Sequence, residues 1–160
     1  MNEKIQKITS FCVDHTTLRE GMYISRVDGD VTTFDLRTRR PNMGDYMDNA
    51  TMHSLEHLFA TYIRNSAIGD KVIYFGPMGC QTGFYLLTRD TAPERVKSEV
   101  IAVLARILSH EGEIFGKSAG ECGNYQNLDL KLGQTEAKRY LEVLRTNGQT
   151  DFSYNGGNQE

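Results

Sequence analysis

The chain has 160 residues, of which 39% are hydrophobic and 24% are charged, a length and composition that suit one globular domain. Lys and Arg number 18 against 21 Asp and Glu, so the formal net charge of -3 argues against a nucleic-acid-binding protein. No stretch approaches the roughly 18 consecutive apolar residues of a membrane span, and residues 1–8 are too polar for an export signal. We therefore expect a cytoplasmic protein that forms a single domain over residues 1–160 and has no nucleic-acid or membrane partner.

The first half of the chain predicts a hairpin followed by a helix. Residues 22–27 and 31–37 are rich in β-forming side chains, and the Asp-Gly-Asp sequence between them predicts a three-residue turn. Proline, glycine and other turn formers make residues 40–49 a connecting loop. Apolar residues then recur at three- and four-residue spacing over 51–65, which predicts an amphipathic helix that ends before Gly69.

The second half predicts two strands and two helices. Residues 72–75 and 83–87 read as strands on either side of a Gly-Pro turn. Thr91, followed by an early proline and by a glutamate three positions on, predicts a capping box that starts a helix closed by Gly112. The last predicted helix spans 134–146.

Hairpin signals favour antiparallel pairing, although strands and helices are interspersed along the chain. We therefore expect an α+β fold in which helices pack on one face of an antiparallel sheet. The tail at about 151–160 is expected to be mobile.

The segment from His53 to His57 has an H-x-x-E-H pattern inside the first predicted helix. Residues four apart lie on one helix face, so both histidines can reach one metal ion, with Glu56 close enough for proton transfer. An isolated pair of histidines would be a chance feature of a solvated face. The intervening glutamate shifts the balance toward a metal site.

A catalytic metal usually has three protein ligands, so the two histidines need another donor. The chain has three cysteines, and an odd number without an export signal makes a disulfide framework unexpected. Cys122 is the best candidate because glycines flank it, while Cys12 and Cys80 are rivals on composition alone. A buried, inert thiol is the plain alternative for each cysteine.

Three motifs together resemble the S-ribosylhomocysteine lyase (LuxS) family, whose members make the precursor of autoinducer-2. They are HSLEH at 53–57, PMGCQTG at 77–83 and ECG at 121–123. Shorter matches are VDH at 13–15, FDLR at 34–37 and EAKR at 136–139. The similarity therefore extends over most of the chain and implies the LuxS/metallopeptidase-like fold.

The resemblance implies a role for eight residues. The metal ligands are His53, His57 and Cys122, the acid/base pair is Glu56 and Cys80, and the substrate contacts are Ser10, His15 and Arg37. It leaves Cys12 without a role. By sequence alone, Arg37 would be a surface charge at a strand end, His15 a structural histidine and Ser10 a turn residue. Tyr74 stands where many family members have an aspartate that holds the homocysteine end of the substrate.

The activity that the resemblance implies is cleavage of the thioether of S-ribosylhomocysteine to homocysteine and 4,5-dihydroxy-2,3-pentanedione. Carbonyl migration precedes β-elimination, and one divalent ion per subunit is expected, Fe²⁺ first, with Zn²⁺ or Co²⁺ as alternatives. The implied assembly is a homodimer with the active site at the interface. The implied setting is autoinducer synthesis, quorum sensing and the recycling of methionine and S-adenosylhomocysteine.

Two other functions fit the residues. H-x-x-E-H is also the signature of a class of zinc peptidases, although those use a downstream glutamate rather than a cysteine. A non-catalytic metal-binding protein would close the site with a fourth protein ligand, for which Cys80 is the candidate.

Overall fold

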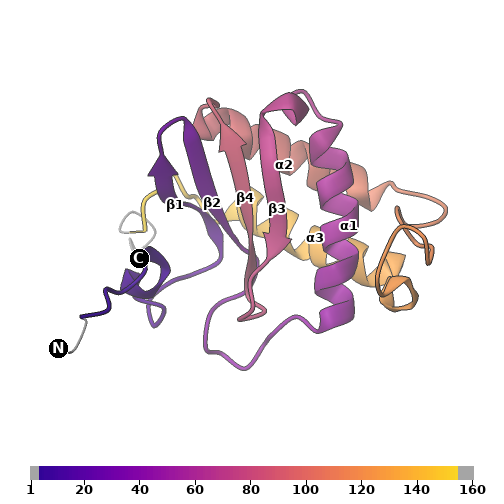
Figure 1. Cartoon of the computed structure of the whole chain (residues 1–160), viewed down its shortest axis with the longest axis horizontal. Helices are drawn as coiled ribbons and strands as arrows, with labels where there is room; N and C mark the ends of the chain where they lie inside the picture. The colour runs from indigo at the N-terminus through magenta and orange to yellow at the C-terminus, as the bar shows by residue number, and fades with distance from the viewer. Residues whose placement is uncertain (1–3, 155–160) are drawn as a thin grey trace.

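Four strands form one antiparallel sheet in the order β1-β2-β4-β3, and three α-helices accompany it (Figure 1). The computed structural model describes residues 4–154. The strands are β1 (Gly21–Asp28), β2 (Val31–Arg37), β3 (Val72–Pro77) and β4 (Gly83–Arg89). The helices are α1 (Asn49–Arg64), α2 (Pro93–Leu108) and α3 (Leu130–Thr146), and the short 3-10 helices are η1 (Thr9–Cys12), η2 (Gly69–Lys71) and η3 (Tyr125–Asn127). The expected α+β fold is confirmed.

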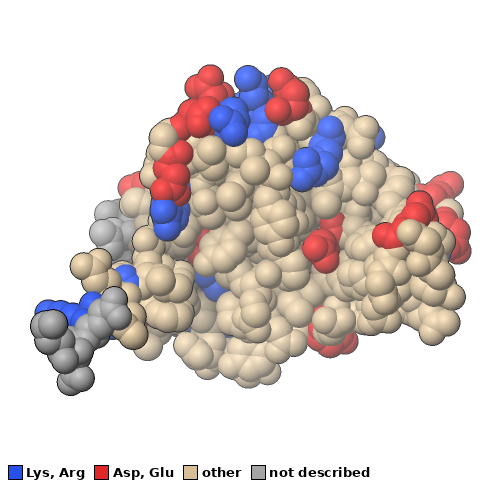
Figure 2. Space-filling view, viewed as in Figure 1, with Lys and Arg blue, Asp and Glu red and all other residues tan. Residues whose placement is uncertain are grey.

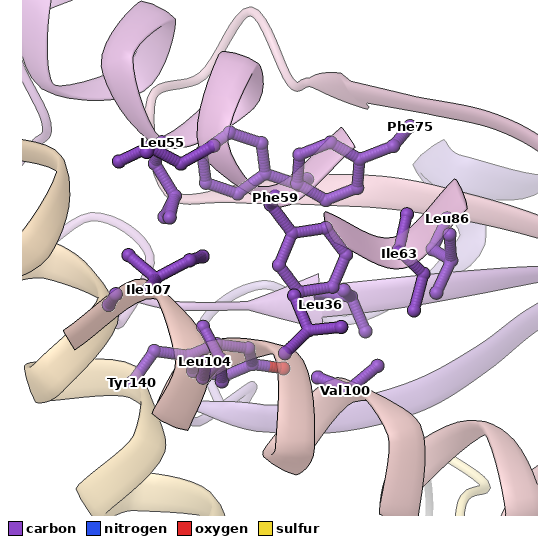
Figure 3. Close-up of a cluster of buried hydrophobic side chains, with 14 of the residues drawn as sticks. Leu36, Leu55, Phe59, Ile63, Phe75, Leu86, Val100, Leu104, Ile107 and Tyr140 are labelled. Atoms are coloured by element: carbon purple, nitrogen blue, oxygen red, sulfur yellow. The ribbon is translucent and has the colours of Figure 1, made fainter. Parts of the chain in front are cut away.

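The hydrophobic core lies between the helices and one face of the sheet (Figure 3). Alternate strand residues point to opposite faces, so Phe34 and Leu36 of β2 enter the core beside Phe84 and Leu86 of β4. Phe75 of β3 stacks on Phe84 with ring centroids 5.0 Å apart. The helices contribute the core's other labelled side chains in Figure 3, which are Leu55, Phe59, Ile63, Val100, Leu104, Ile107 and Tyr140.

Helix boundaries differ from the expected ones where side-chain caps decide them. Helix α1 begins at Asn49 because the Asp48 side chain accepts from the Thr51 backbone N–H. The Thr51 hydroxyl and then this backbone N–H hold the pKa of Asp48 below its usual value. Helix α3 begins at Leu130, earlier than expected, because Asp129 caps Leu132 in the same way.

The predicted capping box at Thr91 is wrong. The N-cap of α2 is Ala92 without a side-chain cap, and the Thr91 hydroxyl donates to the Arg89 carbonyl instead. Pro93 favours the start of α2 at this point, because its fixed backbone angle φ is compatible with the first position of a helix.

The connections also differ in detail from the expected ones. Gly69 lies in η2 and Gly112 in the loop after α2, beyond the helix ends at Arg64 and Leu108. The β1–β2 turn has two residues, with Gly29 at φ 62, rather than three. The predicted three-residue turn is wrong because Asp28 pairs with Val31 across the hairpin and therefore belongs to β1.

The described part of the expected mobile tail is held against β1. The Ile24 N–H donates to the Phe152 carbonyl at 2.7 Å, and the Tyr154 ring stacks on Tyr23 with centroids 5.2 Å apart. Backbone pairing and ring stacking therefore order residues 151–154. Residues 155–160 lie outside the described part of the chain.

Candidate active site

Helix α1 places His53, Glu56 and His57 on its half-buried side. The helix buries Leu55, Leu58 and Phe59 in the core, and the half-buried polar residues lie beside this apolar stripe. The two imidazole rings meet edge to face with centroids 4.6 Å apart. The helical spacing of the motif thus brings both rings together as expected.

Both histidines have a hydrogen-bond acceptor at Nδ1. His53 Nδ1 donates to the side-chain oxygen Oδ1 of Asn127, and His57 Nδ1 donates to the Phe115 carbonyl at 2.7 Å. Gly116, at φ 71, lets the backbone pass this close, since a Cβ there would lie 3.0 Å from His57 Nδ1. A proton on Nδ1 leaves the Nε2 lone pair of each ring free to bind a metal.

Cys122 brings a third candidate donor to the two histidines. It lies in the loop between α2 and α3, and its Sγ is 3.3 Å from His53 Nε2. The ligand atoms of His53, His57 and Cys122 all lie within 4.8 Å of one another. Two neutral imidazoles and a thiolate fit a divalent transition metal such as Zn²⁺, Co²⁺ or Fe²⁺. Neither Cys12 nor Cys80 joins this group among residues 4–154.

Arg37 is buried, contrary to its interpretation as a surface charge. Its side chain is 3% exposed and forms a two-pronged ion pair with Asp35, which is 1% exposed, at 3.0 and 2.6 Å. Burial by itself lowers the pKa of Arg37, but the Asp35 carboxylate outweighs this and raises it. The guanidinium is therefore a fixed positive charge inside the protein.

Cys80 lies at the exposed turn between β3 and β4 rather than in the core. Its Sγ is 3.1 Å from the Thr82 hydroxyl and accepts from Arg37 Nη1 at 3.7 Å. Gln81 beside it has φ 64, and its side-chain amide donates to the Met47 carbonyl at 2.8 Å. The turn thus holds the thiol next to the buried guanidinium.

The two groups of side chains are separate within one chain. Figure 1 shows α1 between β3 and the orange loop that carries Cys122. The described contacts of Cys80 are with Arg37 and Thr82, whereas those of the histidines are with Asn127, Phe115 and Cys122. Of the expected acid/base partners, Cys80 therefore lies beside Arg37 and Thr82, whereas Glu56 lies on the helix that carries His53 and His57.

Ser10 and His15 lie in the N-terminal segment, whose residues Thr9, Cys12 and Asp14 line a pocket together with Ser25 and Tyr154. Ser10 is half-buried in η1, and His15 Nδ1 is 2.9 Å from the Val13 carbonyl. Tyr74 is 52% exposed on β3, and its side chain covers Gly76, where a Cβ would lie 2.1 Å from the tyrosine hydroxyl.

Sequence reasoning missed Asp35, Asn127 and Tyr154. The Tyr154 hydroxyl donates to Asp35 at 2.9 Å, and burial followed by the charge of Asp35 raises the pKa of Tyr154. Asp35 could have been found from the sequence, because residues two apart on a strand share a face and its charge is opposite to that of Arg37. Nothing local marks Asn127 or Tyr154, because both act on residues far away in the sequence.

An α+β fold that presents two imidazoles and a thiol within reach of one ion defines the chain as a candidate metalloprotein. Comparison with known proteins then gives the family. The S-ribosylhomocysteinase (LuxS) family model matches residues 8–151. The chain therefore belongs to this family, which is one of carbon–sulfur lyases.

Relatives match over nearly their whole length. An S-ribosylhomocysteine lyase of Desulfotalea psychrophila is 44% identical over 94% of this chain and 99% of the relative. Proteins with the same name from Finegoldia magna and Clostridium beijerinckii are 43% and 41% identical, over 88% and 89% of this chain and 92% and 94% of those relatives. Within residues 4–154, none of the helices has the length and apolar character needed to cross a bilayer.

Proposed function

We propose that residues 1–160 form a single lyase domain that cleaves S-ribosylhomocysteine to homocysteine and 4,5-dihydroxy-2,3-pentanedione. The observation that carries the proposal is the cluster of His53, His57 and Cys122 on and beside the helical turn that bears Glu56. Family membership supplies the substrate class.

The reaction is an internal redistribution of hydrogen followed by an elimination, so it consumes neither water nor an oxidant. The substrate carbonyl is at C1 and the sulfur at C5. Proton transfers move the carbonyl from C1 through C2 to C3, where it makes the C4 proton acidic. Loss of that proton breaks the C5–S bond, and homocysteine leaves with the bonding electrons. Each step needs a group that takes a proton from carbon and another that returns one to oxygen or carbon.

The residues present can divide this work. A divalent ion held by His53, His57 and Cys122 would supply Lewis-acid stabilisation of the negative charge that develops on substrate oxygens. The Glu56 carboxylate accepts and returns protons from its place between the two histidines. The Cys80 thiol is the second acid/base group, and it lies beside the Arg37 guanidinium. Ser10, His15 and Arg37 are the proposed substrate contacts.

Fe²⁺ is the proposed native ion, with Zn²⁺ and Co²⁺ as substitutes, since this donor set accommodates all of them. The proposed location is the cytoplasm. The proposed setting is autoinducer synthesis together with the recycling of methionine and S-adenosylhomocysteine, because the products are a dihydroxydione and homocysteine.

Release of free thiol tests the proposed reaction. Anaerobically purified protein given S-ribosylhomocysteine is expected to release homocysteine, detected with a thiol reagent. Glu56→Gln, which keeps the shape but loses the base, is expected to lower the rate by roughly 10² to 10⁴-fold, the usual contribution of acid/base catalysis. The matched control is Glu142→Gln on the exposed side of α3, expected to leave the rate unchanged.

Two results would contradict this function. Metal-loaded protein that releases no thiol is not a lyase, and cleavage of peptides by that protein would favour the metallopeptidase. Thiol release that is equal in the wild type and Glu56→Gln would remove Glu56 from the mechanism.

We further propose a homodimer in which the active site forms at the interface. In support, the Cys80 and Glu56 clusters are separate in one chain, so a second copy would have to bring them together. The helix-free face of the sheet, which includes the exposed Tyr74 and the partly exposed Tyr85 and Leu87, offers a surface for such an association. Figure 2 shows that the centre of the molecule seen from this side is largely uncharged, with charged side chains along the upper edge and acidic ones at the right.

Mixing two inactive variants tests the shared site. Cys80→Ala and Glu56→Gln are each expected to be inactive alone. If every site takes Cys80 from one subunit and Glu56 from the other, mixed dimers regain one intact site, and an equal mixture recovers about a quarter of the wild-type rate. Light scattering confirms the dimer. A mixture that stays inactive although mass spectrometry detects mixed dimers would show that each subunit builds its site alone.

A further inference from the structure

The side-chain amide of Asn127 lies between His53 and Asn49. Its oxygen Oδ1 accepts from His53 Nδ1, and its nitrogen Nδ2 donates to the Asn49 side-chain oxygen at 2.7 Å. Asn49 is the first residue of α1 and lies four positions before His53 on the same helix. The amide therefore bridges two residues on one side of α1.

We propose that Asn127 is a positioning residue that sets the tautomer and the ring orientation of His53, with Asn49 holding the Asn127 amide in the required orientation. This inference rests on the proposed function in so far as His53 is a metal ligand. It adds to that function a residue that governs how tightly the ion is held.

The physical reason lies in the two nitrogens of a neutral imidazole, only one of which carries a proton. An acceptor at Nδ1 favours the tautomer with the proton there, so the Nε2 lone pair faces the Cys122 sulfur 3.3 Å away. Without the acceptor, the ring is free to place its proton on Nε2 or to rotate. Loss of such an outer partner typically weakens metal binding by about 10 to 100-fold.

The two histidines differ in how they are held. The Phe115 carbonyl that accepts from His57 belongs to the backbone and is present whatever the side chain. The acceptor for His53 is a neutral amide oxygen, which polarises an imidazole less than a carboxylate does. Position 127 is therefore the place where a single side chain tunes the affinity of this site.

The loop around Asn127 has anchors that do not involve its amide. The Asp129 backbone N–H donates to the Ser54 hydroxyl at 2.8 Å, and Leu128 is 3% exposed in the core. Asp129 also caps α3. A substitution of the Asn127 side chain thus leaves the backbone of the loop tied to α1.

Metal transfer from the loaded protein to a chelator tests the proposal without substrate. Starting from protein loaded with Co²⁺, Asn127→Leu is expected to weaken retention of the ion by roughly 10 to 100-fold. Asn127→Asp, which keeps an acceptor and adds charge, is expected to hold Co²⁺ at least as tightly as the wild type. Asn49→Ala frees the amide to rotate and is expected to fall between them. Gln126→Leu, next to Asn127 in η3 and exposed, is the matched control and is expected to match the wild type.

The visible absorption of bound Co²⁺ gives a second readout, because it reports the ligand field directly. Asn127→Leu is expected to shift this spectrum, and Asn127→Asp to restore the wild-type band positions. If Asn127→Leu does not fold, the order of Asn127→Asp, wild type and Asn49→Ala still decides the question.

Retention of Co²⁺ by Asn127→Leu within about twofold of the wild type would overturn the proposal, since an outer partner is worth at least about tenfold. Equal losses of Co²⁺ affinity in Asn127→Leu and Asn127→Asp would overturn it too, because the aspartate keeps an acceptor for His53 Nδ1. The acceptor would then not be what the site requires. Failure of the lyase assay leaves these affinities unaffected, so the two proposals fail separately.

Discussion

Replacing Cys122 with alanine is expected to remove the bound metal ion during purification. The variant loses one of three donors that lie within 4.8 Å of one another, and two imidazoles on one helix turn do not complete a site. The loss of affinity is expected to exceed the roughly 10 to 100-fold that follows from losing an outer partner. Elemental analysis of the purified variant measures the metal content per chain.

The other thiols provide matched controls. Cys12→Ala changes an exposed cysteine of η1 and is expected to keep both metal and turnover. Cys80→Ala is expected to keep the metal and lose turnover, and loss of metal in this variant would favour the non-catalytic, four-ligand site. Full metal content in Cys122→Ala would contradict the assigned ligand set and favour the metallopeptidase.

Arg37→Met is expected to lower the free energy of unfolding by about 3 to 5 kcal/mol, the usual cost of breaking a buried ion pair on one side. The substitution keeps much of the side-chain volume but leaves Asp35, 1% exposed, with the Tyr154 hydroxyl and without its cation. Urea denaturation at one fixed protein concentration measures the change.

The control for Arg37 is an exposed ion pair on the same sheet. Arg89 pairs with Asp30 at 2.9 Å, and both side chains are 53% exposed, so Arg89→Met is expected to cost about 0.2 to 1 kcal/mol. The double variant Arg37→Met with Asp35→Leu is expected to recover most of the stability, since it removes both charges of the buried pair. An equal, small loss in Arg37→Met and Arg89→Met would mean that water reaches Asp35.

Local patterns were enough to place the strands, the helices and the two histidines. The period of the apolar residues over 51–65 predicts α1, and once that helix exists His53 and His57 must share a face. Hairpin signals likewise predicted the antiparallel sheet. These features depend on residues close together in the chain, so local periodicity and backbone geometry are sufficient to predict them.

Capping was less predictable, because several polar residues near a helix start can compete for it. Thr91 satisfies the pattern of an N-cap but donates to the Arg89 carbonyl, whereas Asp48 and Asp129 do cap their helices. Which residue caps the helix depends on the direction in which the preceding strand or loop enters it.

The sequence by itself determined the α+β class, the helical H-x-x-E-H motif and, through its motifs, the family. Only the tertiary structure decided that Cys122 joins the histidines, that Arg37 is buried against Asp35, and that Cys80 lies beside this guanidinium. The tertiary structure also decided that the Asn127 side chain accepts a hydrogen bond from His53, 74 positions away in the sequence. The physical reason is that periodicity specifies which face a side chain occupies, whereas burial and long-range hydrogen bonds depend on which elements pack together.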